Sequence, residues 1–310
     1  MNQLARVRTD LFQVRHLTRY RYHKPVRFGQ HRGMFRPIDA PDLRLISMRF
    51  ETRPEAVVHW VHDVFSNAVT LFDFEGESDV LEVECTFEVV RSHVEEPVFP
   101  IDEHARLYPF EYRPEQQVDL APSIMSHYSD PDGTVQAFAR RFTQAGSGET
   151  WKILETMNQA IHEEFDYQRR EEPGVRTPAD TIARRSGSCR DYAVLMCELA
   201  RRLGFAARFV TGYLYDPSLD AAVNGERDGK QGSGATHAWV TIFLPGAGWI
   251  EFDPTNGNVA SGSLIKTGVA RTAGQAVPLA GSFEGMTSDA AGMEVSVEVT
   301  TLAPTLTSEE

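Results

Sequence analysis

The chain has 310 residues, of which 41% are hydrophobic and 24% charged, and its formal net charge is −13. This length suffices for two ordinary domains, and the negative charge excludes a global basic surface for nucleic acid. No apolar run approaches the roughly 20 residues that span a bilayer, and arginines interrupt the N-terminus where a signal peptide would need an apolar core. We therefore expect a cytoplasmic globular protein with neither a nucleic-acid nor a membrane partner.

The first third of the chain predicts β-structure. In "FQVRHLTRYRY" (12–22) and "LEVECTFEVV" (81–90), apolar and polar residues alternate, which is typical of strands with one buried face. A turn signal at Ser66-Asn67 lies between further short strand-like runs. Residues about 95–125 are Pro-rich and aperiodic, which indicates a long connection. The pattern predicts a β-sandwich-like N-terminal domain over residues 1–120.

The next segment, residues 121–260, predicts an α+β unit. Apolar residues at helical spacing follow Thr150, and a second apolar stripe runs from Cys189 to Gly204, which is placed to end that helix. The strand-like runs "AARFVTGYLY", "THAWVTIFLP" and "GWIEFDPT" follow, with a polar, Gly-rich loop at 216–235 between the first two. Residues 261–310 form a C-terminal extension, in which "GMEVSVEVTTL" predicts a last strand that returns to a sheet.

Cys189 is a candidate nucleophile because of its place at the start of an apolar helix, directly behind a Ser-Gly-Ser turn. The unpaired N–H groups and the dipole of a helix N-terminus favour an anion such as a thiolate. Gly187 permits close backbone approach, and the N–H of Cys189 can point at a developing oxyanion. Such a thiol also needs a base, normally histidine, and a group that orients this base.

His237 and Asp253 are the candidates for these two roles. His237 opens one strand-like run, and Asp253 ends the next. If the two strands pair antiparallel through the short "PGAG" turn, residues 237 and 253 face each other across the ladder. The sequence thus predicts a Cys189–His237–Asp253 triad, defined by the roles of its members.

These blocks resemble a known family. "GSCRDYAVLMCELARRLGFAARFVTGY" and "HAWVTIFLPGAGWIEFDPTNG" are similar to the transglutaminase-like core of the papain-like cysteine enzymes, and the N-terminal part resembles the corresponding region of bacterial members. The resemblance implies a papain-like core with Cys189 as nucleophile, His237 as base and Asp253 as orienting group. Two departures stand out: Arg190 replaces the tryptophan of animal transglutaminases, and Ser66 stands where the family's N-terminal turn has glycine.

The other candidates are weaker, and most have structural alternatives. Cys85 and Cys197 fit core positions, and three cysteines do not make a disulfide framework. His59 and His62 fall on opposite faces of a strand, so we expect no metal site and no cofactor. The arginines at 184, 185, 190, 201 and 202 are expected mostly on the solvent face of their helix. Candidate substrate contacts are Arg190, Asp191, Trp239 and Tyr167, the last also a candidate second oxyanion donor.

The predicted chemistry is acyl transfer through a thioester on a peptide or protein substrate. Water as acceptor gives a protease or amidase, and a lysine amine gives a transglutaminase. We expect hydrolysis, because water is always available whereas crosslinking needs a dedicated site for the second amine. The alternatives are protein-glutamine transglutamination, and a non-enzymatic binding or scaffold module on the same fold. Substrate identity, the role of the N-terminal domain and the oligomeric state stay open.

Overall fold

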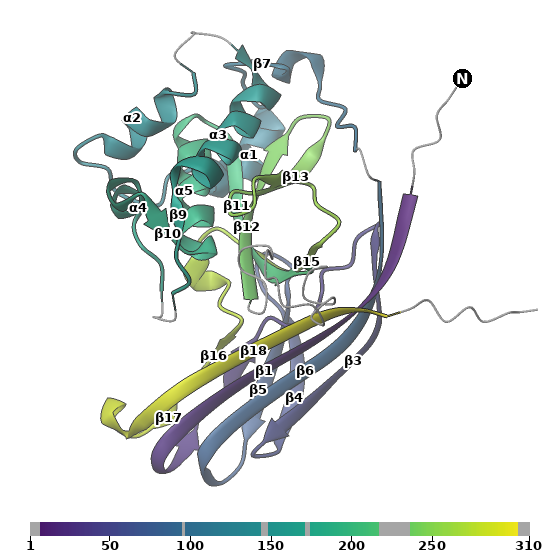
Figure 1. Ribbon diagram of the computed structural model, residues 1–310, viewed down its shortest axis with the longest axis vertical. Helices are drawn as coiled ribbons and strands as arrows, with labels where there is room; N and C mark the ends of the chain where they lie inside the picture. Colours follow the sequence, from purple (N-terminus) through teal and green to yellow (C-terminus); the bar gives the residue numbers. More distant parts are fainter. Residues whose placement is uncertain (1–6, 95–96, 144–147, 171–173, 217–235, 303–310) are drawn as a thin grey trace, which may run out of the picture.

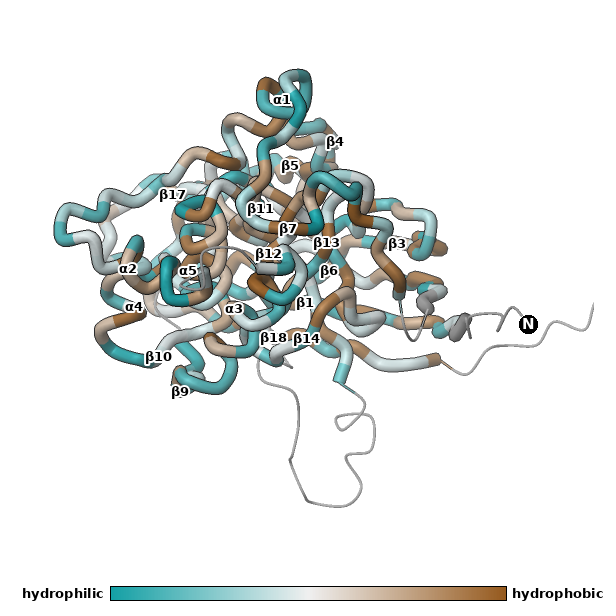
Figure 2. The backbone as a smooth tube through the Cα atoms, turned by 90° about the horizontal axis from the view of Figure 1, so that it is seen from above, coloured by the Kyte–Doolittle hydropathy of each residue, from teal (hydrophilic) through white to brown (hydrophobic). Residues whose placement is uncertain are grey.

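The computed structural model describes residues 7–94, 97–143, 148–170, 174–216 and 236–302. It has two parts: a β-sandwich, which lies below in Figure 1, and a mixed α+β core above it. Seen from above, hydrophobic segments gather around the central strands, whereas the chain near the peripheral strand β9 is hydrophilic (Figure 2). The predicted Gly-rich loop falls almost entirely outside the described residues.

The first sheet of the sandwich is built on one long strand, β1 (Val7–Phe28). Its alternating pattern buries Phe12 and Val14 and leaves Arg15 exposed, as predicted. β1 pairs antiparallel with β6 (Glu77–Val94) on one side and with β18 (Ala290–Leu302) on the other. The remaining strands of this sheet are β3 (Leu43–Arg53) beside β6 and β17 (Phe283–Glu284) beside β1.

The predicted last strand is β18, and its return to a sheet is confirmed. β18 adds to the N-terminal sheet beside β1 (Figure 1). β15 (Leu264–Ala270), in contrast, joins the sheet of the core. The residues that we assigned to one C-terminal extension are therefore divided between the two parts of the molecule and tie them together.

The second sheet of the sandwich has the order β16-β2-β5-β4. An apolar core that includes Phe12, Phe72 and Phe87 joins the two sheets, and Tyr213 and Ile265 of the neighbouring core pack against it. The β-sandwich-like domain is thus confirmed. The strands are β2 (His31–Gly33), β4 (Ala56–His62), β5 (Ala68–Phe74) and β16 (Leu279–Ala280).

The core places the long helix α5 (Cys189–Arg202) against an antiparallel sheet of order β14-β13-β12-β11-β15. Twelve of the residues of α5 are buried, so this helix is packed on nearly every side. Figure 1 shows the other helices gathered around it. The sheet contains β11 (Ala206–Leu214), β12 (Thr236–Leu244), β13 (Gly248–Asp253) and β14 (Asn258–Val259), and the helices are α1 (Pro114–Ile124), α2 (Thr134–Arg140), α3 (Thr150–Glu164) and α4 (Pro178–Arg184).

The expected long connection at residues 95–125 is more ordered than its composition indicated. It contains α1, with Pro114 at the helix start, where a missing N–H costs nothing. The short elements of the chain are η1 (Glu103–Ala105), β7 (Leu107–Tyr108), β8 (Gly148–Glu149), β9 (Asp166–Tyr167), β10 (Ser186–Gly187), η2 (Ala273–Gln275) and η3 (Thr287–Asp289).

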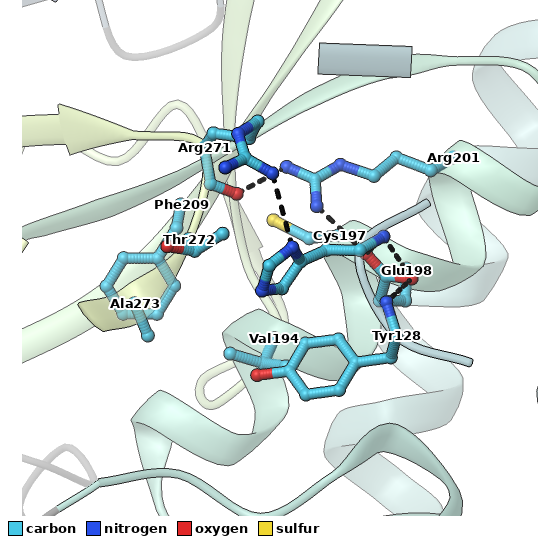
Figure 3. Close-up of a pocket in the computed structure, with 10 residues that line it drawn as sticks. Tyr128, Val194, Cys197, Glu198, Arg201, Phe209, Arg271, Thr272 and Ala273 are labelled. Atoms are coloured by element: carbon cyan, nitrogen blue, oxygen red, sulfur yellow. Dashed lines mark hydrogen bonds and ion pairs between the residues drawn. The ribbon is translucent and has the colours of Figure 1, made fainter. Parts of the chain in front are cut away.

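Arg201 corrects the expectation that the arginines of α5 face solvent. Its side chain is buried and lies 2.9 Å from Glu198, which is buried as well (Figure 3). Arg201 also donates to the backbone carbonyls of Ser123, Ala207 and Arg271. Because each partner of the ion pair is hydrogen-bonded, the pair is tolerated in the interior and fixes α5 against the sheet and the chain before α2.

Candidate active site

Cys189 is the first residue of α5, as the sequence predicted. Gly187, two residues earlier, approaches the helix closely: a Cβ there would lie 2.9 Å from the Cβ of Asp191. The Ser188 backbone N–H donates to the Asp191 carboxylate at 2.9 Å. This local structure places the Cys189 thiol beside backbone N–H groups that the first turn of the helix leaves unpaired.

Asp191 positions this turn and does not face a ligand. Its side chain has no exposed surface. The carboxylate accepts hydrogen bonds from Ser188, from the Arg170 guanidinium and from the backbone N–H of Arg176. The structure therefore gives no surface through which Asp191 could contact a substrate, contrary to our suggestion for this residue.

His237 and Asp253 form a buried pair at one end of the core sheet. Nε2 of His237 lies 3.0 Å from Oδ2 of Asp253, and both residues are almost fully buried. The predicted register is nevertheless wrong by two residues. Val240 pairs with Phe252, so His237 faces the position beyond Asp253, and the two side chains meet diagonally.

Two neighbours of Asp253 complete its hydrogen bonding. Asn256 Nδ2 donates to Oδ2 at 2.8 Å, and the Thr255 N–H donates to Oδ1 at 3.0 Å. Burial would raise the pKa of Asp253, but His237 and these donors hold it below its usual value. Asn256 was not among the predicted site residues, although its place in the "DPTNG" turn after the candidate carboxylate was an available signal.

The charge state of His237 follows from its two neighbours. Burial alone would lower its pKa, but Asp253 and the Cys189 side chain raise it to about 10. Asp253 uses Nε2, whereas Nδ1 is buried and has no hydrogen-bond partner in the described part of the chain. Nδ1 is therefore the nitrogen available for proton exchange with the thiol or a reactant.

Tyr167 is brought to the nucleophile by a short parallel pairing. β9 pairs with β10, so Tyr167 lies opposite Gly187, and the next N–H, of Gln168, donates to the Gly187 carbonyl. Burial raises the pKa of Tyr167, and the charge of Cys189 adds to this effect. Its hydroxyl is therefore protonated at neutral pH, which suits a hydrogen-bond donor.

The two other candidate substrate contacts lie in different surroundings. Trp239 is fully buried and stacks on His237 with 5.9 Å between ring centroids, so it supports the imidazole from behind and does not wall a groove. Arg190 is half-buried, donates to the Arg170 carbonyl and lines a cavity that His237 also lines. Of these two, only Arg190 is placed where a substrate could touch it.

The described residues offer neither a metal site nor a membrane-spanning helix. Within the described ranges, no group of three or more His, Cys, Asp or Glu residues could hold a metal ion. No helix in those ranges is long and apolar enough to cross a membrane. Cys85 and Cys197 are buried and unpaired, as expected for core residues.

Comparison with known proteins agrees with this architecture. Residues 12–90 match the bacterial transglutaminase-like N-terminal region, and residues 136–254 match the transglutaminase-like superfamily. The first match covers β2 to β5 and most of β1 and β6, and the second contains Cys189, His237 and Asp253.

Relatives and a solved structure extend the likeness along the chain. An uncharacterized protein of Mycobacterium leprae is 27% identical over 297 residues, 94% of this chain and 99% of the relative. An uncharacterized protein of Mycobacterium tuberculosis is 29% identical over 153 residues, 48% of this chain and 46% of the relative. A Cytophaga hutchinsonii crystal structure, described as a candidate cysteine protease, superposes with a TM-score of 0.69 at 18% identity, covering 97% of this chain and 93% of that one.

At 18% identity, the structural similarity supports the fold alone. That fold is the predicted one, in which a β-sandwich-like domain precedes a papain-like core. The chain belongs to the transglutaminase-like superfamily, as a member with the bacterial transglutaminase-like N-terminal region.

Proposed function

We propose that this protein is a cysteine-dependent amide hydrolase that acts on peptide or protein substrates. One observation carries the proposal: among the residues that the structure describes, Nδ1 of His237 has no hydrogen-bond partner, while Nε2 is paired with Asp253 and a cysteine at a helix N-terminus lies beside the ring. A nucleophile, a base and a group that orients the base are the parts that covalent acyl transfer requires. The superfamily membership and the fold support the same reading.

In the proposed first half-reaction, the Cys189 sulfur attacks the amide carbonyl while its proton resides on Nδ1 of His237. Negative charge develops on the carbonyl oxygen, and the backbone N–H of Cys189 and the Tyr167 hydroxyl are the proposed donors to it. The C–N bond breaks, and His237 gives its proton to the departing amine. The product is a thioester on Cys189.

In the second half-reaction, a water molecule attacks the thioester and His237 accepts its proton. The C–S bond breaks, the carboxylic acid leaves, and the Cys189 sulfur takes up a proton again. Asp253 stays ionised throughout and stabilises the imidazolium of His237. Its low pKa and its hydrogen bonds from Asn256 and Thr255 support this role.

Isotopic labelling in the presence of a competing amine tests whether water or an amine accepts the acyl group. The protein is incubated with a glutamine- and lysine-containing peptide mixture in H₂¹⁸O with excess biotinylated pentylamine, and the products are read by mass spectrometry. Hydrolysis predicts ¹⁸O in the new carboxylate. Incorporation of the amine into glutamine side chains would instead identify a transglutaminase.

The same assay tests the non-enzymatic alternative. Its control is Cys189→Ala, which removes only the sulfur of a buried side chain at the first position of α5. If the wild type and Cys189→Ala gave the same products, the proposed chemistry would be ruled out and a binding or scaffold role would be favoured.

A further inference from the structure

A cavity of about 450 Å³ lies between the sandwich and the core, beside the proposed catalytic pair. Such a volume is typical of sites that take small ligands or side chains. His237 and Ala238, at the start of β12, line one wall. The face of the β1–β18 ladder lines another, and residues 273–279 close a third side. The N-terminal domain thus contributes directly to the surroundings of His237.

The ladder wall consists of residue pairs in register. Thr18 pairs with Val295 and Tyr20 pairs with Met293, and the period of two along each strand points all four to one face. Thr18 is buried, whereas Met293 is 51% exposed. The wall therefore runs from a closed end inside the molecule to an open mouth.

At the closed end of the cavity lies an uncharged imidazole, that of His16. His16 lies there with both ring nitrogens occupied: Nδ1 is 2.8 Å from the Tyr213 hydroxyl, and Nε2 is 3.1 Å from the Thr18 hydroxyl. Burial lowers the pKa of His16 to about 3, so the imidazole is neutral at physiological pH. Because the polar atoms of His16 are already hydrogen-bonded, a group that enters this end of the cavity would mainly contact uncharged surface.

The mouth of the cavity is apolar as well. Met293 and Val277 are 51% and 38% exposed there, although large hydrophobic side chains gain from burial. Arg190, which also lines the cavity, supplies a cation among the lining residues. An apolar group that entered would remove the exposed hydrophobic surface from water and come to lie beside His237.

We propose that this cavity binds an apolar side chain next to the reacting amide, so that the N-terminal sheet, through β1 and β18, selects the substrates that reach Cys189. The inference rests on the proposed function, because it takes Cys189 and His237 as the reacting groups. The substrate class is a peptide or protein amide flanked by an aromatic or large aliphatic residue. Met293 and Val295 are the residues that determine specificity.

The experiment compares iodoacetamide with N-benzyl-iodoacetamide, and free glutathione serves as the unselective thiol. In both reactions the sulfur of Cys189 forms a C–S bond and iodide leaves, so only the apolar arm differs. The measured quantity is the ratio of the two alkylation rates at Cys189, read by peptide mass spectrometry. Burying the phenyl ring should raise this ratio at least about tenfold above that of glutathione.

Two variants place a charge in the cavity, and one matched variant places it outside. Met293→Glu changes a half-exposed residue at the mouth and Val295→Glu one further inside, and each should lower the rate ratio about tenfold. Ser296→Glu lies on the opposite, exposed face of β18 and should keep the wild-type ratio. Circular dichroism and thermal unfolding confirm that each variant is folded.

The outcomes separate the two proposals. Alkylation at Cys189 without a preference for the benzyl reagent, or a preference that both charged variants retain, overturns the specificity cavity and leaves the proposed function intact. Absence of both selective alkylation of Cys189 and amide turnover overturns the proposed function, and the cavity's role falls with it.

Discussion

Nε2 of His237 lies 3.0 Å from Oδ2 of Asp253, although continuing the β12–β13 register places residue 255, not 253, opposite the histidine. The contact is therefore diagonal, and the turn after β13 holds the carboxylate in place through Thr255 and Asn256. This arrangement assigns separate tasks to the two nitrogens of His237: Nε2 is anchored and Nδ1 is left for chemistry.

These separate tasks predict an order of effects on turnover. Cys189→Ala and His237→Ala should each lower kcat/KM by on the order of 10³-fold or more, because each removes a group that exchanges bonds or protons. Asp253→Asn should cost distinctly less, since the reacting pair remains and only its orientation and charge stabilisation suffer. The rates are measured on one peptide substrate, with circular dichroism as the folding control. Near-normal turnover by His237→Ala would show that it is not the base.

The three cysteines should differ in reactivity in the folded protein. Burial raises the pKa of Cys197 to about 12 and raises that of Cys85 as well, so both are protonated at neutral pH. Cys189 lies at a helix N-terminus beside His237, and iodoacetamide should modify it faster than the other two by on the order of 10²-fold or more. Peptide mass spectrometry gives the three rates, and a sample in guanidinium gives the unfolded reference. Equal rates in the folded state would contradict the prediction.

Local patterns in the sequence predicted much of this molecule. The helix start at Cys189, a strand that begins next to His237, the buried faces of β1 and β6 and the return of β18 all follow from period and from turn residues. Long-range placement did not follow in the same way. The alternating pattern of β18 predicts a strand but does not identify β1 as its partner. The diagonal contact of His237 with Asp253 depends on the pairing register of β12 and β13, which the length of the turn alone does not determine.

The burial of individual charged side chains could not be predicted from the sequence either. Asp191 and Arg201 are of residue types that usually lie at the surface, yet both are buried because groups from distant segments form hydrogen bonds with their charged side chains. One wall of the cavity beside His237 is formed by strands from the two ends of the chain, and no pattern within one segment could reveal it.

The His237–Asp253 pair predicts a pH dependence of stability. The folded-state pKa of His237 is raised to about 10, above its ordinary value near 6.5, so its stabilisation is fully present below pH ~6.5 and is lost as the pH rises toward 10. We expect the difference in unfolding free energy between the wild type and Asp253→Asn to shrink across this window. Urea unfolding at several pH values measures the difference. A flat or growing difference would contradict the raised pKa.

Asp191 should matter for stability as well as for the placement of Cys189. Asp191→Asn leaves the Arg170 guanidinium without its buried carboxylate and places an amide NH₂ among donors. Removing one partner of a buried ion pair costs about 3–5 kcal/mol of unfolding free energy. Asp119→Asn, at an exposed position on α1, is the matched control and should change it by less than about 0.5 kcal/mol. Urea unfolding distinguishes the two, and equal effects would show that the Asp191 network contributes little.

Ser66 is the residue that stands where the family's N-terminal turn has glycine, and its backbone has the left-handed conformation, with φ of 63°. The turn that contains it is held firmly. The Asp63 carboxylate accepts hydrogen bonds from the backbone N–H groups of Phe65 and Asn67, and the Asn67 side chain bonds both backbone groups of Val269 in the core sheet. The turn therefore joins the sandwich to the core, and Ser66 must keep its conformation.

Two opposing effects set the expected result of Ser66→Gly. A left-handed conformation costs a residue with a Cβ about 1–2 kcal/mol, whereas glycine loses about 0.5–1 kcal/mol more in conformational entropy on folding. The net expectation is a stabilisation of about 0.5 kcal/mol, with a loss of about 1 kcal/mol or more for Ser66→Val, since a β-branched residue tolerates this region poorly. Ser296→Gly, in the extended strand β18, is the matched control and should destabilise by about 0.5–1 kcal/mol. Unfolding free energies in urea test the difference in sign between positions 66 and 296. If glycine destabilised the protein equally at both positions, the left-handed backbone of Ser66 would carry no strain, and the family's glycine at this turn would need another explanation.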